Sequence, residues 1–215
     1  MEFALLAGLS EGDRRQVLMA ARRRRFGRRE VIFHEGDPGE ALHLVDSGHV
    51  ALRVTTPAGD VGLVRIVAAG DFFGELALLS DGPRSATALA IETVETLSIT
   101  RADFAALRTR TIATGDFVAN ALAVEVRRLS AAHVEAMFLT VDKRVYRRLA
   151  SAARLFGSSP PIPVPLTQDE VAQLAGTTRP TVNRLLVDAQ EANAVKLSRG
   201  RIEVLDLAWL DHRGR

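Results

Sequence analysis

Residues 73–86 read FGELALLSDGPRSA, and this stretch decides how the amino-terminal half of the chain is interpreted. Gly74 and Glu75 precede Arg84 and Ser85 by about ten residues, within a region of short apolar segments. Gly74 lets backbone N–H groups approach an anion, Arg84 supplies a bidentate cation and Ser85 adds a hydroxyl donor. Glu75 can accept a hydrogen bond from a sugar hydroxyl. The stretch therefore predicts a pocket for a phosphate joined to a ribose, whereas a surface ion pair between Glu75 and Arg84 would explain neither the glycine nor the serine.

The region around this stretch, from Val31 to Ile99, consists of short apolar segments separated by turns. The turn glycines stand about a dozen residues apart, at Gly36, Gly48, Gly59 and Gly70. This regular spacing of short strands is typical of a β-sandwich or barrel. We expect a jelly-roll-like β-roll that is followed, at residues 100–107, by a helix with Thr100 as its N-cap.

A long helix is predicted from about residue 112 to Leu139, where only Gly115 interrupts a helical pattern. Its apolar stripe consists of Val118, Leu122, Leu129, Ala136 and Leu139. At roughly 1.5 Å per residue the helix would be about 40 Å long, more than a small barrel can cover. A narrow apolar face of this length favours pairing with a second copy, so we interpret it as a dimerisation helix, although Glu125 falls in the stripe.

The carboxy-terminal third is expected to fold as a separate basic domain. Residues 141–215 hold 12 Lys and Arg against 8 Asp and Glu, which favours a polyanionic partner. A helix over 143–156 and a connector over 157–165 precede a helix, a turn, a second helix and a small β-hairpin. The sequence thus predicts an α+β protein whose three parts span residues 1–110, 111–141 and 142–215.

The helix–turn–helix prediction rests on the residues between Thr167 and Val182. Thr167 followed by Glu170 forms a capping box that starts the first helix. A small residue, a turn glycine and a β-branched residue follow at the spacing of this motif, as Ala172, Gly176 and Val182. The second helix opens with Pro180 in its first turn, where proline removes only an unsatisfied donor.

Exposed Arg and Asn at the start of this second helix suit the DNA major groove, since Arg can pair with guanine and Asn with adenine. We expect it to present Thr178, Arg179, Thr181, Asn183 and Arg184 to DNA. Basic residues at the tip of the following hairpin would meet phosphates as the wing of a winged helix. These are Lys196, Arg199 and Arg201.

The stretch FGELALLSDGPRSA resembles the phosphate-binding cassette of cyclic-nucleotide-binding domains. The order of β-roll, long helix and winged helix-turn-helix resembles the cAMP receptor protein/fumarate–nitrate regulator family of bacterial transcription factors, over nearly the whole chain. By this resemblance Glu75 would hold the ribose 2′-hydroxyl. The cyclic phosphate would lie against the backbone of Gly74, Glu75 and Leu76 and the side chains of Arg84 and Ser85. On the recognition helix, Arg179 and Arg184 match the family's base-reading arginines.

Two departures from the family pattern affect specificity. Pro180 stands where the family usually has a glutamate, so the family's best-known operator is not expected, and Asn183 is a candidate for part of the altered readout. On the long helix, the family's Thr-Ser pair that meets the adenine is missing. An ungapped count places Leu129-Ser130 there, whereas anchoring on RRL at 127–129 places Ala132-His133. The ligand expected first is cAMP, with cGMP or a cyclic dinucleotide as alternatives.

The resemblance implies a homodimer that binds double-stranded DNA at a pseudo-palindromic operator and contacts RNA polymerase. No cysteine is present, no pair among five histidines has a ligand spacing and no catalytic set stands out, so we expect neither a metal site nor an enzyme. The run RRRRFGRRE at 22–30 is interpreted as a solvated face before the first strand rather than a nucleic-acid or membrane contact. Without a signal peptide or an apolar run of membrane-spanning length, a cytoplasmic location is expected.

Two alternative functions stay open at this point. One is a regulator of the same architecture that needs no small molecule, its cassette being a structural relic. The other is a cyclic-nucleotide-binding module that acts on a protein partner instead of on DNA.

Overall fold

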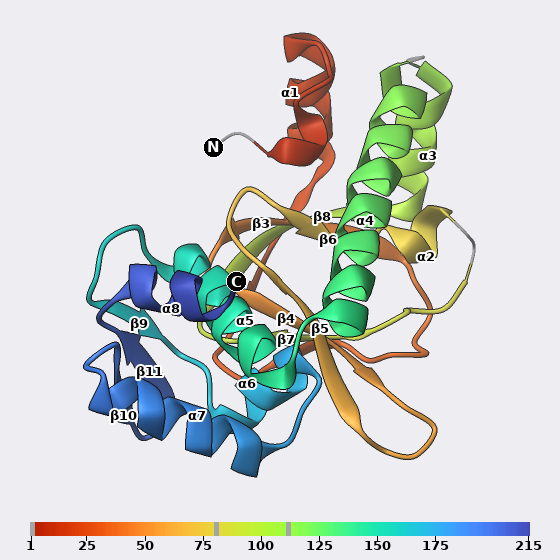
Figure 1. Ribbon diagram of the computed structural model, residues 1–215. Coiled ribbons are helices and arrows are strands. Elements are labelled where there is room, and N and C mark those ends of the chain that lie inside the picture. The colour runs from red at the N-terminus through yellow and green to blue at the C-terminus, as the bar shows by residue number, and fades with distance from the viewer. Residues whose placement is uncertain (1–2, 80–81, 111–112) are drawn as a thin grey trace. The chain divides into compact units, whose positions relative to one another are not determined.

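A computed structural model of the chain describes residues 3–79, 82–110 and 113–215 (Figure 1). The chain divides into two compact units, one of residues 1–54 with 66–130 and one of residues 55–65 with 131–215. The predicted α+β class is confirmed, with a β-rich amino-terminal part, a long helix and a carboxy-terminal helix-turn-helix with a small sheet. In the part of the chain that the structure describes, none of the helices has the length and hydrophobicity that a membrane span requires.

Two four-stranded sheets lie in the described residues of the amino-terminal half. The first has the order β1-β8-β3-β6 and the second the order β2-β7-β4-β5. The first sheet comprises β1 (Arg22–Phe26), β8 (Val94–Thr100), β3 (Ala41–Ser47) and β6 (Phe72–Phe73). The second comprises β2 (Val31–Phe33), β7 (Thr87–Ala90), β4 (Val50–Thr55) and β5 (Val61–Val67). The pairs β1–β8, β3–β8, β3–β6, β2–β7 and β4–β7 are antiparallel.

Strand β3 is buried on both faces because each face meets a different apolar layer. Leu42 and Leu44 pack into a cluster with the amino-terminal helices, whereas Val45 packs into the layer between the two sheets. This alternation follows from the two-residue period of a strand. The layer between the sheets consists of Phe26, Val45, Val50, Val67, Phe73, Ala88, Ala90 and Val94. The core of the β-roll thus lies between the sheets.

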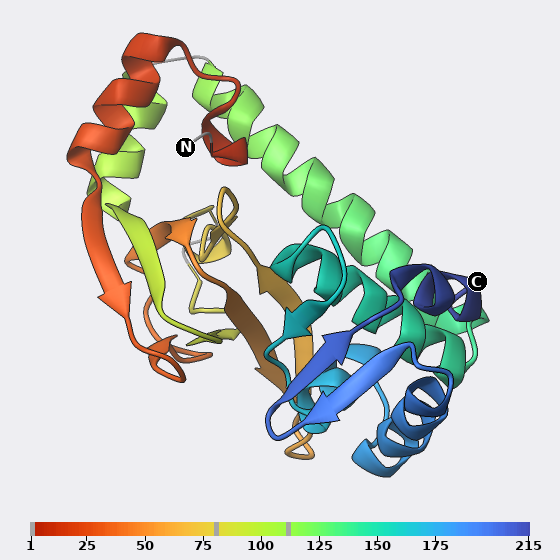
Figure 2. The same ribbon diagram turned by 90° about the vertical axis from the view of Figure 1, so that its left-hand side faces the viewer.

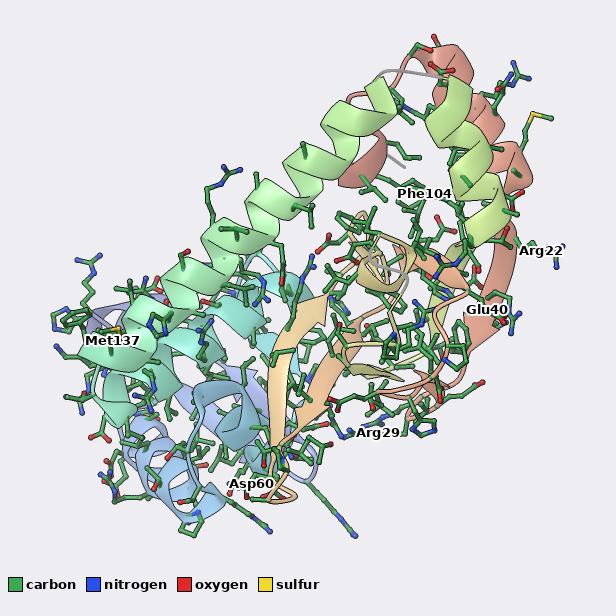
Figure 3. All side chains as sticks on the ribbon, turned by 90° about the vertical axis from the view of Figure 1, so that its right-hand side faces the viewer. Arg22, Arg29, Glu40, Asp60, Phe104 and Met137 are labelled. Carbon is green, nitrogen blue, oxygen red and sulfur yellow. The ribbon has the colours of Figure 1, made fainter. Side chains whose placement is uncertain are left out.

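Helices cover the outer face of the first sheet. They are the 3-10 helix η1 (Ala4–Leu6), α1 (Glu11–Ala20), α2 (Leu76–Leu79) and α3 (Arg101–Arg110). Figure 2 shows α1 beside α3, and Phe104, labelled in Figure 3, joins the apolar cluster beneath them. The predicted cap of α3 is confirmed, since the Asp103 N–H donates to Thr100 Oγ1 over 3.2 Å.

The first strand begins at Arg22, nine residues before the first strand that the sequence predicted. The arginine side chains of β1 are exposed as expected, but the run itself pairs along its whole length with β8. Arg23 donates to Asp46 over 2.9 Å and to Glu95 over 2.8 Å. Apolar alternation is absent from this strand because only Phe26 reaches the core, which is why the sequence pattern missed it.

The predicted long helix is α4 (Ala113–Phe138). Residue 112 and the side chain of Val118 lie outside the described part. Apolar side chains of α4 that stand in solvent are Leu122, Val124, Val126, Leu129, Val134, Met137 and Phe138. Met137, near the end of the helix, is labelled in Figure 3.

The second unit contains the helix-turn-helix and a small sheet. Its helices are α5 (Val141–Phe156), α6 (Gln168–Ala175), α7 (Arg179–Glu191) and α8 (Leu207–Arg213). The sheet has the order β10-β11-β9, with β10 (Val195–Ser198), β11 (Arg201–Val204) and β9 (Ile162–Val164). The capping box of Thr167 and Glu170 is confirmed, and Gly176 ends α6 with φ of 61°.

Two elements of this unit differ from the sequence prediction. The segment 157–165 was expected to be a connector alone, but it contains β9, whose exposed Pro163 lies on an edge strand where no ladder donor is needed. The hairpin is therefore part of a three-stranded sheet. Helix α8 was also missed: Asp206 caps it, accepting from the Trp209 N–H over 2.9 Å, and Trp209 packs edge-on against Tyr146.

Candidate functional site

Arg84 is the buried cation of the cassette, with only 5% of its surface exposed. Its Nη1 donates to the Gly74 carbonyl over 2.8 Å and its Nη2 to the Ala41 carbonyl over 2.6 Å. Its Nε, also buried, has no hydrogen-bond partner among the described residues. Burial lowers the pKa of Arg84, and the nearby carboxylates of Asp37, Glu75 and Glu40 oppose that shift. A buried donor without a partner is costly, so this side chain is suited to donate a hydrogen bond to an anionic oxygen.

Gly74 is required by the position of Arg84. Its φ of 82° is in the left-handed region, and a Cβ built there would lie 2.6 Å from Arg84 Nη1 and 3.3 Å from the Ala41 carbonyl oxygen. Such a contact is sterically forbidden, so any side chain at residue 74 would displace the guanidinium. The absence of a side chain at Gly74 thus leaves room for the Arg84 guanidinium, in addition to leaving the backbone accessible.

The other predicted cassette residues surround this core. Glu75 is half-buried and its charge acts on Arg84, while the Leu76 side chain is 36% exposed and Ser85 is exposed. Residues 80 and 81, which belong to the predicted stretch, lie outside the described residues. Arg84 itself is held through its backbone, because its N–H donates to the Asp37 carbonyl and its carbonyl accepts from Gly36.

An aromatic cluster lies beneath Arg84 and was not anticipated from the sequence. The guanidinium carbon is 4.0 Å from the centre of the Phe33 ring, and Phe33 in turn packs against Phe73 and His43. His43 stacks on Phe73 at 5.1 Å and its Nδ1 lies 3.1 Å from Thr96 Oγ1. Burial, with smaller contributions from the Arg84 and Arg24 charges, lowers the pKa of His43 to about 3, so this ring is neutral.

Arg128 of α4 is a second residue that sequence reasoning missed. It makes a bidentate pair with Glu125, at 2.9 and 2.5 Å, which raises the pKa of Arg128. The charges of Asp71 and Glu75 raise it further, so the long helix carries a cation that acts on the cassette. The pair of arginines at 127–128 was the sequence feature that could have identified Arg128 as a candidate.

The candidate base-contacting positions of α4 are all on its surface. Leu129 and Ser130 are exposed, and so is His133, while Ala132 is half-buried. Their contact with a ligand base is a prediction.

Helix α7, the candidate recognition helix, turns its apolar side chains inward as the sequence predicted. Val182, Leu185 and Leu186 are buried, whereas Arg179, Asn183 and Arg184 are exposed and Thr181 is half-buried. Thr178, the N-cap residue, forms a 3.1 Å hydroxyl contact with Thr181. The predicted proline is in the first turn. One face of α7 therefore displays the polar set that was expected to meet DNA.

Both base-reading candidates are paired with carboxylates. Arg184 Nη2 lies 3.3 Å from Asp142 Oδ1, and Arg184 Nη1 lies 4.0 Å from Asp188. Arg179 Nη1 lies 3.8 Å from Asp169 of α6. All of these side chains are largely exposed, so the pairs are weak and can be exchanged for phosphate or base contacts.

The wing and the recognition helix face one cleft. A hollow of about 400 Å³ is lined by residues of α6, α7 and the hairpin, among them Asp169, Arg179, Asn183, Arg199 and Arg201. Arg199 is in the turn and Arg201 begins β11, as predicted for the tip. Lys196 instead lies within β10, opposite Glu203, with 4.0 Å between Nζ and the carboxylate. The arginines are therefore better placed than Lys196 to reach a phosphate.

Family models match both halves of this arrangement. A model described as "Cyclic nucleotide-binding domain" matches residues 23–111, and one described as "Crp-like helix-turn-helix domain" matches residues 143–213. The chain is 34% identical to "Cyclic AMP receptor protein" of Thermus thermophilus, over 96% of this chain and 94% of that protein. It is 30% identical to the "CRP-like cAMP-activated global transcriptional regulator" of Mycobacterium tuberculosis, over 88% and 87%.

The chain belongs to the cAMP receptor protein/fumarate–nitrate regulator (Crp/Fnr) family. It is a Crp-like transcription regulator with a cyclic-nucleotide-binding domain and a helix-turn-helix domain, and its relatives are regulators, not enzymes.

Solved Crp/Fnr structures agree with this assignment. The catabolite activator protein of Thermus thermophilus matches with a TM-score of 0.56 and 34% identity, covering 98% of this chain and 97% of that chain. A putative Crp/Fnr regulator from Eubacterium rectale has the same fold, with a TM-score of 0.79 at 20% identity, covering 99% and 98%.

Proposed function

We propose that this Crp/Fnr protein is a homodimeric DNA-binding regulator whose operator affinity is controlled by a cyclic nucleotide, with cAMP as the first candidate. Residues 1–110 bind the nucleotide, residues 111–141 form the dimer helix and residues 142–215 bind DNA. The names of two relatives that cover most of the chain refer to cyclic AMP, which supports this choice. Nucleotide binding would favour one of two arrangements of the helices and DNA-binding domains. This requires that the nucleotide bind the two arrangements with different affinities.

The observation that carries the proposal is the state of Arg84. Arg84 is 95% buried and its Nε–H has no hydrogen-bond partner among the described residues, which is unusual for a residue with a structural role alone. An anionic phosphodiester oxygen satisfies that donor with a charge-assisted hydrogen bond. Glu75 on the same segment carries a carboxylate that can accept a hydrogen bond from a ribose hydroxyl, and exposed Ser85 follows Arg84 directly. These three residues therefore match the chemistry of a cyclic ribose phosphate.

The proposed DNA contacts use the α7 face and the wing. Arg179, Asn183 and Arg184 would read base edges, with Thr178 and Thr181 at the helix start and Lys196, Arg199 and Arg201 toward phosphates. In a dimer, two such helices about one DNA turn apart would read a pseudo-palindrome. Pro180 cannot accept a hydrogen bond from a cytosine amino group, so the sequence that is read depends more heavily on Asn183.

A second candidate function is favoured by one observation. Arg84 already donates to two backbone carbonyls, which is how a purely structural arginine would be stabilised. The chain also lacks the Thr-Ser pair at the Leu129-Ser130 and Ala132-His133 positions. A regulator that binds its operator without any small molecule fits both facts. A regulator that responds to cGMP or a cyclic dinucleotide fits the missing Thr-Ser pair.

The test combines calorimetry with operator binding. The purified chain is titrated with cAMP and with cGMP, and bound duplexes are selected from a random DNA pool with and without each nucleotide. We expect cAMP to bind and to raise operator affinity. Arg84→Leu should lose the nucleotide response while it retains nonspecific DNA binding.

Equal cAMP affinity for the wild type and Arg84→Leu would refute the pocket. Operator binding that does not change with any nucleotide would support the effector-free regulator. A protein-binding role for the helix-turn-helix predicts that binding to duplex DNA will not weaken as salt rises, in contrast to a true DNA-binding surface.

A further inference from the structure

Phe33 is fixed directly beneath the guanidinium of Arg84. It ends β2, where it pairs with Ala88 of β7, and three of the four residues that follow it are tied to the Arg84 segment. Glu35 N–H donates to Thr87 Oγ1 over 3.0 Å, Gly36 N–H donates to the Arg84 carbonyl over 2.9 Å, and Arg84 N–H donates to the Asp37 carbonyl over 2.8 Å. Ring and guanidinium are therefore placed by the same short stretch of backbone.

The geometry between them is that of a cation–π contact. The guanidinium carbon lies 4.0 Å from the ring centre, well inside the roughly 6 Å within which the ring quadrupole attracts a cation. Arg84 is almost fully buried, so water does not weaken this attraction as it does at the surface. The contact is described by the guanidinium carbon, and the buried Nε has no hydrogen-bond partner among the described residues.

The Phe33 ring is itself held in place from below. Its centre is 5.7 Å from that of Phe73 and 6.2 Å from that of His43, and these two rings stack on each other. His43 is neutral because burial keeps it deprotonated, so no second cation opposes Arg84 from beneath. The layer under the guanidinium is thus aromatic and uncharged.

The carbonyls of Gly74 and Ala41 alone do not fix the guanidinium plane. Each accepts one hydrogen bond, from Nη1 and Nη2 respectively, and such bonds tolerate tilting of the donor group. A ring face 4.0 Å away restricts that tilt, because the plane must lie over it to keep contact. The direction of the unpaired Nε–H therefore depends on Phe33.

We propose that Phe33 is the positioning residue of the anion site: its ring holds the Arg84 guanidinium in the orientation in which the free Nε–H meets the phosphate of the ligand. The inference rests on the proposed function, since it takes a cyclic nucleotide as that ligand. Phe33 acts through Arg84 and needs no contact of its own with the nucleotide. Removing its π face should weaken cyclic-nucleotide binding by about 2-fold to 30-fold, the range expected for a partly desolvated cation–π contact.

The test compares three variants of the full chain by calorimetry with cAMP. Phe33→Leu removes the aromatic face and keeps an apolar side chain, whereas Phe33→Tyr keeps the face. Phe26→Leu is the matched control: Phe26 also packs against His43 in this cluster, but Arg84 does not lie over it. We expect Phe33→Leu to bind cAMP about 2-fold to 30-fold more weakly, and the other two variants to stay within about twofold of wild type.

A second readout needs no ligand. A proton held over an aromatic ring is shifted upfield by the ring current, so the Arg84 Nε–H resonance, assigned by its loss in Arg84→Lys, should move in Phe33→Leu. It should stay in place in Phe26→Leu. Because loss of the ring alone removes the ring-current shift, this resonance tests whether the Nε–H lies near the Phe33 ring, and the positioning role is tested by the loss of cAMP affinity in Phe33→Leu but not in Phe26→Leu.

The outcomes separate the two proposals. If the wild type binds cAMP and Phe33→Leu binds it equally well, or Phe26→Leu weakens binding as much as Phe33→Leu does, the positioning role is wrong and the proposed function stands. If the wild type binds neither cAMP nor cGMP, the proposed function fails and the positioning role fails with it. Weakened binding in Phe33→Leu, recovery in Phe33→Tyr and a selective Nε–H shift together support the inference.

Discussion

Arg184 of the recognition helix and Asp142 of α5 form an ion pair, with 3.3 Å between Nη2 and Oδ1. One of the two arginines expected to read bases is therefore held by a carboxylate from another helix of the same unit. A DNA phosphate or guanine must compete with that carboxylate for the same guanidinium. The pair is exposed on both sides, which makes it weak enough to exchange.

Replacing this carboxylate should strengthen DNA binding. We expect Asp142→Asn to raise operator affinity by about twofold to fivefold, because an exposed ion pair of up to about 1 kcal/mol no longer has to be broken. Glu11→Gln is the control, since it removes the same charge from the first turn of another helix, α1. Fluorescence titration of a labelled operator at fixed salt measures the operator affinity of both variants. Equal effects of the two substitutions would mean that net charge, and not the pair, sets the affinity.

Gly74→Ala tests the steric link between the glycine and the buried arginine. An alanine there adopts a left-handed backbone at a cost of about 1–2 kcal/mol and also meets Arg84 Nη1. Gly59→Ala is matched to it, because Gly59 has φ of 91° but open space where a Cβ would lie. Both variants should therefore lose stability in urea unfolding, and only Gly74→Ala should lose cyclic-nucleotide binding. If both variants lost cyclic-nucleotide binding, backbone strain and not the contact with Arg84 would be the cause.

His43 should make the β-roll less stable in mild acid. Its pKa is about 3 in the folded protein against 6.5 for an ordinary histidine, so below pH 6.5 the unfolded chain binds a proton that the folded chain does not. Stability therefore falls as the pH falls. Between pH 7 and pH 5 this one group should remove about 2 kcal/mol from the free energy of unfolding.

The measurement is urea unfolding at pH 7 and pH 5, followed by far-UV circular dichroism. We expect His43→Gln to reduce the difference between the two pH values, and His34→Gln, at an exposed histidine, to leave it unchanged. Fluorescence of Trp209, the only tryptophan of the sequence, reports the carboxy-terminal unit and should be unaffected by either substitution. An unchanged pH difference in His43→Gln would show that other groups cause the acid sensitivity.

The sequence predicted those parts of the fold whose signals are local. The capping box at Thr167 and the left-handed turn at Gly176 depend on residues within one helical turn, and both are confirmed. Strand β1 and strand β9 were missed because their stability comes from partners far along the chain, β8 and β11. Arginine and proline runs carry no apolar period from which such pairing can be read.

The same distinction applies to the candidate site. Gly74, Glu75, Arg84 and Ser85 could be proposed from the sequence because all four lie in one short stretch. Phe33 and Ala41 were not, since they reach Arg84 only through the packing of β2 and β3 beside the cassette. Arg128 likewise acts on Glu75 from a helix more than fifty residues later. Contacts between distant segments are where the structure added to the sequence.

An exposed apolar stripe on α4 indicates how the protein assembles. Leu122, Val126 and Leu129 recur at spacings of four and three, so they share one face of the helix, and Val126 is 61% exposed. Val124 is 58% exposed but lies about 200° around the helix from Leu122, on the opposite face. Single exposed apolar residues are common, whereas a stripe of them at heptad-like spacing is typical of a helix that pairs.

Val126→Glu should therefore convert the protein to a monomer and abolish cooperative binding to a two-half-site operator. A buried, unpaired carboxylate on each helix would cost more than a modest dimer interface supplies. Val124→Glu introduces the same charge at similar exposure on the other face and should leave the dimer intact. Sedimentation equilibrium over a range of concentrations measures the oligomeric state of both variants. A Val126→Glu protein that sediments as a dimer would place the interface elsewhere, and dissociation by Val124→Glu alone would assign it to the opposite face of α4.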